Sequence, residues 1–145
     1  KAVHDIAEAD AMKAVAGFTI LNDVTARSMQ KKDIAAKNPW FRSKSIDSFC
    51  PVGPCLVPAD ALDDPQNLDI RLTVNGEVRQ QGNTSGMLFG IEKIVSEISK
   101  FMTLLPGDII ATGTPAGVGP VGHGDEIEVS VEGIGVLRNQ VQREK

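Results

Sequence analysis

Residues 70–81 read Ile70-Arg-Leu-Thr-Val-Asn-Gly-Glu-Val-Arg-Gln-Gln81, and they carry the clearest structural pattern in the chain. Apolar and polar residues alternate over residues 70–74, as they do in a strand with one buried face. Asn75-Gly76 follows at once, and this dipeptide favours a two-residue turn between antiparallel strands. Residues 77–81 then return as the partner strand. The stretch therefore predicts a β-hairpin.

A second hairpin is expected toward the other end of the sequence. Residues 126–131 alternate in the same way, Gly133-Ile134-Gly135 provides a turn, and residues 136–141 return. With hairpins predominating over helices, the sequence predicts an α+β fold whose sheets roll into a barrel-like core. At 145 residues the chain has the length of one domain, and we expect residues 1–145 to form it.

Helices are expected where apolar residues recur at intervals of three and four, at residues 8–16, 24–32 and 91–102. In the last of these, six apolar residues fall on one face and predict a core-facing helix: Ile91, Ile94, Val95, Ile98, Phe101 and Met102. Short strands are expected at residues 18–21 and 56–57.

The composition is that of an ordinary soluble protein, with 41% hydrophobic and 23% charged residues and a net charge of −4. The mild acidity argues against nucleic acid or a membrane surface as a partner. No apolar run approaches the roughly 18 residues of a membrane span. Two histidines cannot complete a zinc site with Cys50 and Cys55. We expect these cysteines to be buried free thiols in a reducing cytoplasm, with a local disulfide as the alternative.

A glycine-rich loop, Ile109-Ile-Ala-Thr-Gly-Thr-Pro-Ala-Gly-Val-Gly119, follows a predicted short strand at Ile109-Ile110. Thr112 and Thr114 flank Gly113, so hydroxyls and backbone N–H groups are available to an oxyanion. The loop lacks the Lys-Ser/Thr of a phosphate-binding P-loop. The alternative reading is a tight irregular turn.

Other polar residues lie near the ends of predicted strands and helices. Asp23 is at the end of a predicted strand and close to the N-terminus of a predicted helix, where a carboxylate is electrostatically favoured. It is either a functional carboxylate or the helix cap. Arg27 and Gln30 are three residues apart and project from the same side of that helix. Lys44 is either a pocket lysine or a solvated cation at a strand edge.

Four segments, in order, resemble one family. Residues 17–30, reading GFTILNDVTARSMQ, are similar to its GY…NDxTARxxQ signature, and residues 42–47, RSKSID, to its xKSFD element. Residues 74–82, VNGEVRQQG, and the stretch 106–119, beginning PGDIIATGTP, match its C-terminal half. The chain is thereby identified as a member of the fumarylacetoacetate hydrolase superfamily over nearly all its length.

The resemblance implies a mixed β-sheet roll of the family's C-terminal domain type, usually a homodimer. It implies a small-molecule substrate, a 2-oxo or enolisable acid, and a divalent metal, Mg²⁺ or alternatively Mn²⁺ or Ca²⁺. Asp23 matches the family's third metal carboxylate, and Lys44 and Thr114 match catalytic positions. The residues at substrate-contacting positions are Arg27, Gln30, Lys44, Gly113 and Thr114.

The function expected from this resemblance is a metal-dependent enzyme that works through a metal-bound enolate. The reactions open to it are hydrolysis of an acylpyruvate or 2,4-dioxo acid, decarboxylation of oxaloacetate, and isomerisation or decarboxylation of hydroxymuconate-type diacids. Residues 75–82 and 131–135 slightly favour the family's isomerase/decarboxylase branch, whose members act in aromatic-compound catabolism.

One departure from the family pattern matters. The family's Glu-x-Glu metal ligands and its N-terminal lid precede the position of residues 8–16, so this sequence offers Asp23 as one ligand of three. We therefore expect the natural chain to be longer. The alternative is a catalytically inactive binding or assembly subunit with an incomplete metal site.

Overall fold

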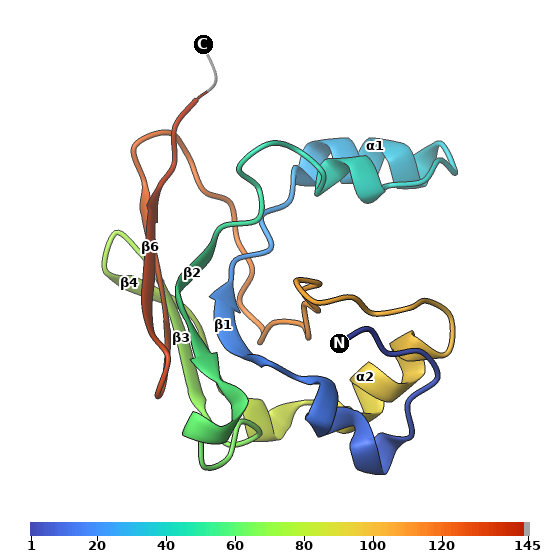
Figure 1. Cartoon of the computed structure of the whole chain (residues 1–145). Coiled ribbons are helices and arrows are strands. Elements are labelled where there is room, and N and C mark those ends of the chain that lie inside the picture. The colour runs from blue at the N-terminus through green and yellow to red at the C-terminus, as the bar shows by residue number, and fades with distance from the viewer. Residues whose placement is uncertain (144–145) are drawn as a thin grey trace.

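The computed structural model describes residues 1–143, and a four-stranded antiparallel sheet is its largest element (Figure 1). The strands lie in the order β4 (Glu77–Asn83), β3 (Asp69–Val74), β5 (Glu126–Val131) and β6 (Gly135–Gln140). Both predicted hairpins are confirmed, because β3 pairs with β4 and β5 with β6. The turn of the first has positive φ at both Asn75 (53°) and Gly76 (80°), as a tight two-residue hairpin turn requires.

A second, two-stranded sheet packs against the first. Its strands β1 (Gly17–Leu21) and β2 (Val52–Pro58) are antiparallel, and they include the two short strands expected from the sequence. Buried residues from both sheets and from the connections between strands form the main core: Ile20, Leu68, Ile127, Val129, Ile134 and Leu137. The α+β class is confirmed, and the strand pairings within residues 1–143 are antiparallel.

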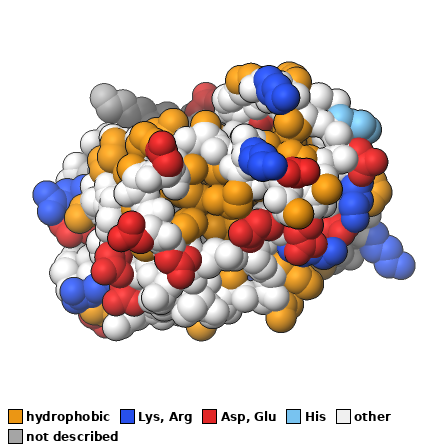
Figure 2. Space-filling view, turned by 60° about the horizontal axis from the view of Figure 1, so that its bottom comes forward, with side chains coloured by type: hydrophobic (Ala, Val, Ile, Leu, Met, Phe, Trp, Pro, Cys, Tyr) orange, Lys and Arg blue, Asp and Glu red, His pale blue; other side chains and the backbone are white. Residues whose placement is uncertain are grey.

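Helix α2 (Ile91–Ser99) and the 3₁₀ helix η1 (Glu8–Ala14) build a second core. Ala11, Ile91 and Val95 are buried between them, with Phe18 of β1 and Ile110 at the edge. The helix expected over residues 91–102 is too long, because the chain leaves the helix after Ser99. Phe101 and Met102 are therefore exposed rather than core residues. Figure 2 shows the end of the molecule that carries α2, where apolar side chains lie among acidic ones.

Helix α1 (Arg27–Ala35) lies at the opposite end of the molecule from α2 (Figure 1). It begins three residues later than expected, and its N-cap residue, Ala26, offers no side-chain cap. Asp23 is therefore not the helix cap. Three shorter 3₁₀ helices complete the elements: η2 (Phe41–Ser43), η3 (Ala59–Ala61) and η4 (Thr84–Gly86).

Two further expectations are wrong. Ile109 and Ile110 form no strand, because they make no backbone ladder with another part of the described chain, and Ile109 is exposed. Cys50 and Cys55 are free, but both are exposed rather than buried. Within residues 1–143, every helix is too short or too polar to cross a bilayer.

Candidate active site

The antiparallel course of β1 and β2 continues beyond the end of β1. Three backbone hydrogen bonds carry it onward: Asn22 N to Pro51 O at 3.0 Å, Val24 N to Phe49 O at 3.0 Å, and Ala26 N to Ser43 O at 2.9 Å. The segment 22–26 is thereby fixed alongside the segment 43–51. Asp23 and Lys44, which are 21 residues apart in sequence, are brought together by this pairing.

Asp23 and Lys44 form an ion pair between Oδ2 and Nζ. Lys44 Nζ also donates to the Thr25 hydroxyl at 3.1 Å. The side chains of Lys44 and Asp23 are 29% and 48% exposed, so a small ligand can reach both. Ion pairs this accessible contribute little to folding. The pair therefore adds little to the stability of the fold and leaves both charged groups accessible to a ligand.

A second ion pair holds the Lys44 segment to α1. The Asp33 carboxylate is 2% exposed and accepts two hydrogen bonds from Arg42, one from Nε at 2.8 Å and one from Nη2 at 2.5 Å. This bidentate geometry is rigid as well as strong. Arg42 precedes Lys44 by two residues, so the pair fixes the short helix η2 from which Lys44 emerges.

The Asp33–Arg42 pair predicts an acid-dependent loss of stability. The hydrogen bonds from Arg42 hold the pKa of the Asp33 carboxyl below its usual 3.8, although burial opposes them. A lowered folded-state pKa means that the stabilisation is full above about pH 5 and is lost as the pH falls from there through the folded value. Urea unfolding from pH 7 to 2.5 is expected to show a steeper acid decline for the native protein than for Asp33→Asn.

The control for that comparison is Asp10→Asn, which removes a carboxylate from an exposed pair with Lys13. It should unfold like the native protein at every pH. Glu97 adds an acid dependence common to all three proteins, because hydrogen bonds from Lys100 and Lys93 lower its pKa to about 2. Parallel pH curves for the native protein and Asp33→Asn would contradict the prediction.

Arg27 and Gln30 form a third group, on the first turn of α1. Arg27 Nη1 donates to Gln30 Oε1 at 2.9 Å, which confirms that the two side chains share one side of the helix. Because Oε1 is the acceptor, the amide NH₂ of Gln30 is left to donate elsewhere. Both side chains are thus donors for an anion.

The glycine-rich loop packs on β4. Gln80 Nε2 donates to Thr114 Oγ1 at 2.8 Å and to the Pro115 carbonyl at 2.6 Å. Gly117 lies so close to the strand that a Cβ there would be 2.0 Å from Arg79 O, and its φ is 108°. Gly113 has a φ of 112°. The Thr114 side chain is left exposed at the loop surface.

The predicted site residues therefore occur in three groups: Asp23 with Lys44, Arg27 with Gln30, and Thr114 beside Gly113. Within residues 1–143, no hydrogen bond or ion pair joins one group to another. The sequence reading missed Thr25, Gln80 and the Asp33–Arg42 pair. Gln80 had a detectable signal, since it is a polar residue directly opposite the inward-facing Leu72 on an alternating strand.

The donor set suits a hard divalent cation only in part. The Asp23 carboxylate is an oxygen ligand of the kind that Mg²⁺ and Mn²⁺ prefer. Within residues 1–143, however, no three acidic, histidine or cysteine side chains cluster closely enough to hold a metal. Among residues 1–143, Asp23 can therefore offer a metal at most a single carboxylate.

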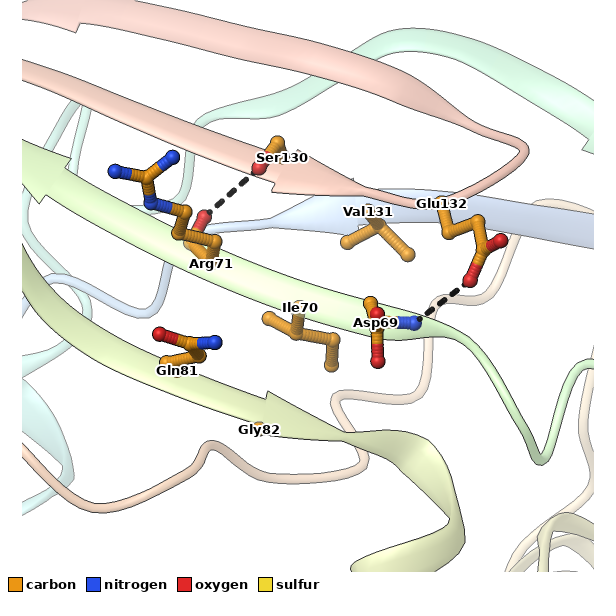
Figure 3. Close-up of a pocket in the computed structure, with 8 residues that line it drawn as sticks. All are labelled: Asp69, Ile70, Arg71, Gln81, Gly82, Ser130, Val131 and Glu132. Carbon is orange, nitrogen blue, oxygen red and sulfur yellow. Dashed lines mark hydrogen bonds between the residues drawn. The ribbon is translucent and has the colours of Figure 1, made fainter.

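A shallow hollow of about 370 Å³ lies elsewhere, across the ends of β3, β4 and β5 (Figure 3). Its lining residues are Asp69, Ile70, Arg71, Gln81, Gly82, Ser130, Val131 and Glu132. None of them is a predicted site residue. Polar groups in the hollow bond to one another, with Asp69 N donating to Glu132 Oε2 at 3.2 Å and Ser130 Oγ to Arg71 O at 3.3 Å. The hollow is therefore a weaker candidate than the Asp23–Lys44 pair.

Comparison with known proteins agrees with the motifs. Residues 1–142 match the family model described as fumarylacetoacetate (FAA) hydrolase C-terminal. The mitochondrial oxaloacetate tautomerase of Bos taurus is 46% identical over 143 residues, covering 99% of this chain and 64% of that protein.

Two solved structures share the fold. A 5-carboxymethyl-2-hydroxymuconate delta-isomerase from Mycobacterium smegmatis has a TM-score of 0.93 and 46% identity, covering all of this chain and 55% of the other. A fumarylpyruvate hydrolase from Pseudomonas aeruginosa, in complex with Mn²⁺ and pyruvate, has a TM-score of 0.94 and 34% identity, covering 99% and 61%.

The chain spans about a third to two thirds of the length of the curated relatives that it matches along nearly its whole extent. The names of the isomerase, tautomerase and hydrolase relatives are those of enzymes acting on small organic acids. The motif order, the fold and the family model agree over almost every residue. The chain therefore belongs to the fumarylacetoacetate hydrolase family, in which it corresponds to the C-terminal domain.

Proposed function

We propose that residues 1–145 form the catalytic core of a divalent-metal-dependent enzyme that converts a 2-oxo or otherwise enolisable acid through an enolate. The observation that carries the proposal is the accessible ion pair between Asp23 and Lys44 at the end of β1. It combines a hard oxygen ligand with an ammonium group, and both are within reach of one small ligand.

Each of the predicted site side chains has a role suited to an acidic substrate. The Lys44 ammonium would offset negative charge on the substrate oxygen as the enolate forms. The guanidinium of Arg27 and the amide NH₂ of Gln30 would bind a substrate carboxylate. The Thr114 hydroxyl, on the glycine-rich loop beside Gly113, would orient the substrate.

Asp23 would be one of the ligands to the metal, and the remaining ligands would come from a Glu-x-Glu strand outside residues 1–145, as the family resemblance implies. When bound, Mg²⁺ or Mn²⁺ would polarise the 2-oxo group and stabilise negative charge on its oxygen. The Mn²⁺ complex of the related fumarylpyruvate hydrolase supports a divalent cation. We propose Mg²⁺ as the physiological ion.

The candidate reactions share one step. In a proton shift the proton leaves carbon 3 of a keto acid or the 2-hydroxyl of an enol acid, in decarboxylation carbon dioxide leaves, and in acylpyruvate hydrolysis the acyl group leaves to water. In each case the electron pair remains on the 2-oxo acid as an enolate, which then takes up a proton. We favour a proton shift for this chain, because the two 46% identical relatives described above are named an isomerase and a tautomerase.

The test is turnover by the full-length protein of a hydroxymuconate-type diacid, oxaloacetate and an acylpyruvate. At least one should be converted in the presence of Mg²⁺ or Mn²⁺, and chelation should stop the reaction until metal is added back. Failure with all three, in a protein that is folded and loaded with metal, would favour the alternative of a catalytically inactive binding or assembly subunit.

We also propose a homodimer, on the family resemblance, and a cytoplasmic location, on the free thiols of Cys50 and Cys55. Sedimentation equilibrium of the full-length protein at micromolar concentration is expected to give twice the monomer mass. A monomer across that concentration range would contradict the expectation.

A further inference from the structure

We infer that Gln80 is a positioning residue that fixes the direction of the Thr114 hydroxyl, so that Thr114 donates its proton to an anionic oxygen of the bound acid. The inference rests on the proposed function, and it adds a residue that none of the sequence motifs had singled out for the site.

The direction of the hydrogen bond between Gln80 and Thr114 follows from the chemistry of Gln80 and of the two groups that it contacts. The Pro115 carbonyl can only accept a hydrogen bond, so the side-chain atom 2.6 Å from it must be the amide nitrogen of Gln80. That same nitrogen is 2.8 Å from Thr114 Oγ1 and donates there as well. Thr114 is thus an acceptor toward Gln80.

A hydroxyl that accepts one hydrogen bond still has a proton to donate. Gln80 is 8% exposed, whereas Thr114 is exposed, so the free O–H is on the side that a ligand can approach. The donor is held in place before any ligand arrives. A preorganised donor stabilises a developing oxyanion more than one that must first reorient.

The contact between loop and strand is tight on both sides of Gln80. Gly117 packs against the backbone oxygen of Arg79, and a Cβ at Gly82 would be 3.0 Å from the Pro115 ring. The loop therefore cannot rotate Thr114 away without losing these contacts. If Gln80 served only to donate to the Pro115 carbonyl, the second hydrogen bond from the same nitrogen, to Thr114, would have no explanation.

The sharpest substitution is Gln80→Glu, because a carboxylate accepts hydrogen bonds and would draw the Thr114 proton toward itself. Turnover number (kcat) should fall by about 10²–10³-fold, as for the loss of one preorganised oxyanion donor, with KM much less affected. Thr114→Val removes the hydroxyl and should show a similar loss. The double variant should be no worse than Thr114→Val, because both changes remove the same donor.

The matched control is Gln81→Glu, the same change one residue along β4, where the side chain faces the opposite side of the sheet and lines the hollow in Figure 3. It should retain native kcat. Thermal melts identify any variant that fails to fold. If Gln80→Glu does not fold, Gln80→Met replaces it: it should lose less kcat than Thr114→Val and should lose nothing further in the Thr114→Val background.

Two results would overturn the inference: native kcat in a folded Gln80→Glu protein, or losses that multiply in the double variant. Calorimetric measurement of oxalate affinity distinguishes failure of this inference from failure of the proposed function. Oxalate is a planar dianion shaped like a small enolate, and its binding requires no turnover. Gln80→Met and Thr114→Val should both weaken oxalate binding, and the double variant should bind oxalate no more weakly than Thr114→Val, even if no substrate is turned over. Native oxalate affinity in Gln80→Met, or losses that add in the double variant, would contradict the positioning role whatever the reaction proves to be.

Discussion

Replacing Lys44 with alanine is expected to lower kcat about 10²–10³-fold while leaving the melting temperature nearly unchanged. The large kinetic effect follows from loss of the ammonium that, under the proposed function, would offset charge on the developing enolate oxygen. The small stability effect follows from the exposure of the ion pair, since accessible pairs contribute little to folding. Saturating Mg²⁺ is needed in the assay, so that a change in metal affinity is not mistaken for loss of the lysine.

Lys44→Arg sharpens the same test. A planar guanidinium cannot replace a compact ammonium that contacts both Asp23 and Thr25, so this variant should also lose most of its activity. Lys13→Ala is the matched control, because Lys13 is also ion-paired, to Asp10, but is 78% exposed. Near-native turnover in Lys44→Arg would mean that charge alone suffices, and Lys44 would then lose its specific catalytic role.

Replacing Asp23 with asparagine is expected to abolish metal-dependent turnover and leave the fold intact. The amide keeps the size of the side chain but loses the negative charge that a hard cation requires. It also leaves Lys44 without its counter-ion. The measurement is kcat as a function of Mg²⁺ concentration, together with direct metal binding to the full-length protein.

Asp60→Asn serves as the control, since Asp60 is an exposed carboxylate on η3 with no predicted role in the site. It should bind metal and turn over substrate as the native protein does. Full activity in Asp23→Asn at low Mg²⁺ would remove Asp23 from the proposed metal site.

Much of the sheet could be predicted because its signals are local. Alternation with a period of two and the Asn75-Gly76 turn specify the first hairpin without reference to the rest of the chain. The residues at which helices and strands begin and end were harder to predict from the sequence. Helix α1 starts at Arg27, and the structure gives a tertiary reason, since the backbone N–H of Ala26 is held by Ser43 rather than by a local cap.

The failure at Ile109-Ile110 has a related cause. An apolar pair after a turn resembles a short buried strand, but a strand exists only where another segment pairs with it. Ile110 instead packs, partly buried, against the core between α2 and η1. No property of the pair itself distinguishes the two outcomes.

The candidate site residues were chosen by motif, but their grouping could not be predicted from the sequence. The Asp23–Lys44 contact spans 21 residues and depends on how β1 and β2 run past one another. The Gln80–Thr114 bond spans 34 residues and depends on the loop packing against β4. The buried Asp33 was missed because one acidic residue on a polar helix gives no sign of a partner nine residues away.

The most direct test of the enolate account is exchange of the carbon-3 protons of pyruvate in deuterium oxide, followed by proton NMR with the full-length protein. The account predicts protein-catalysed exchange that requires Mg²⁺ or Mn²⁺, stops on chelation, and is lost in both Lys44→Ala and Asp23→Asn. Exchange no faster than metal and buffer alone produce, or exchange that survives both substitutions, would contradict it.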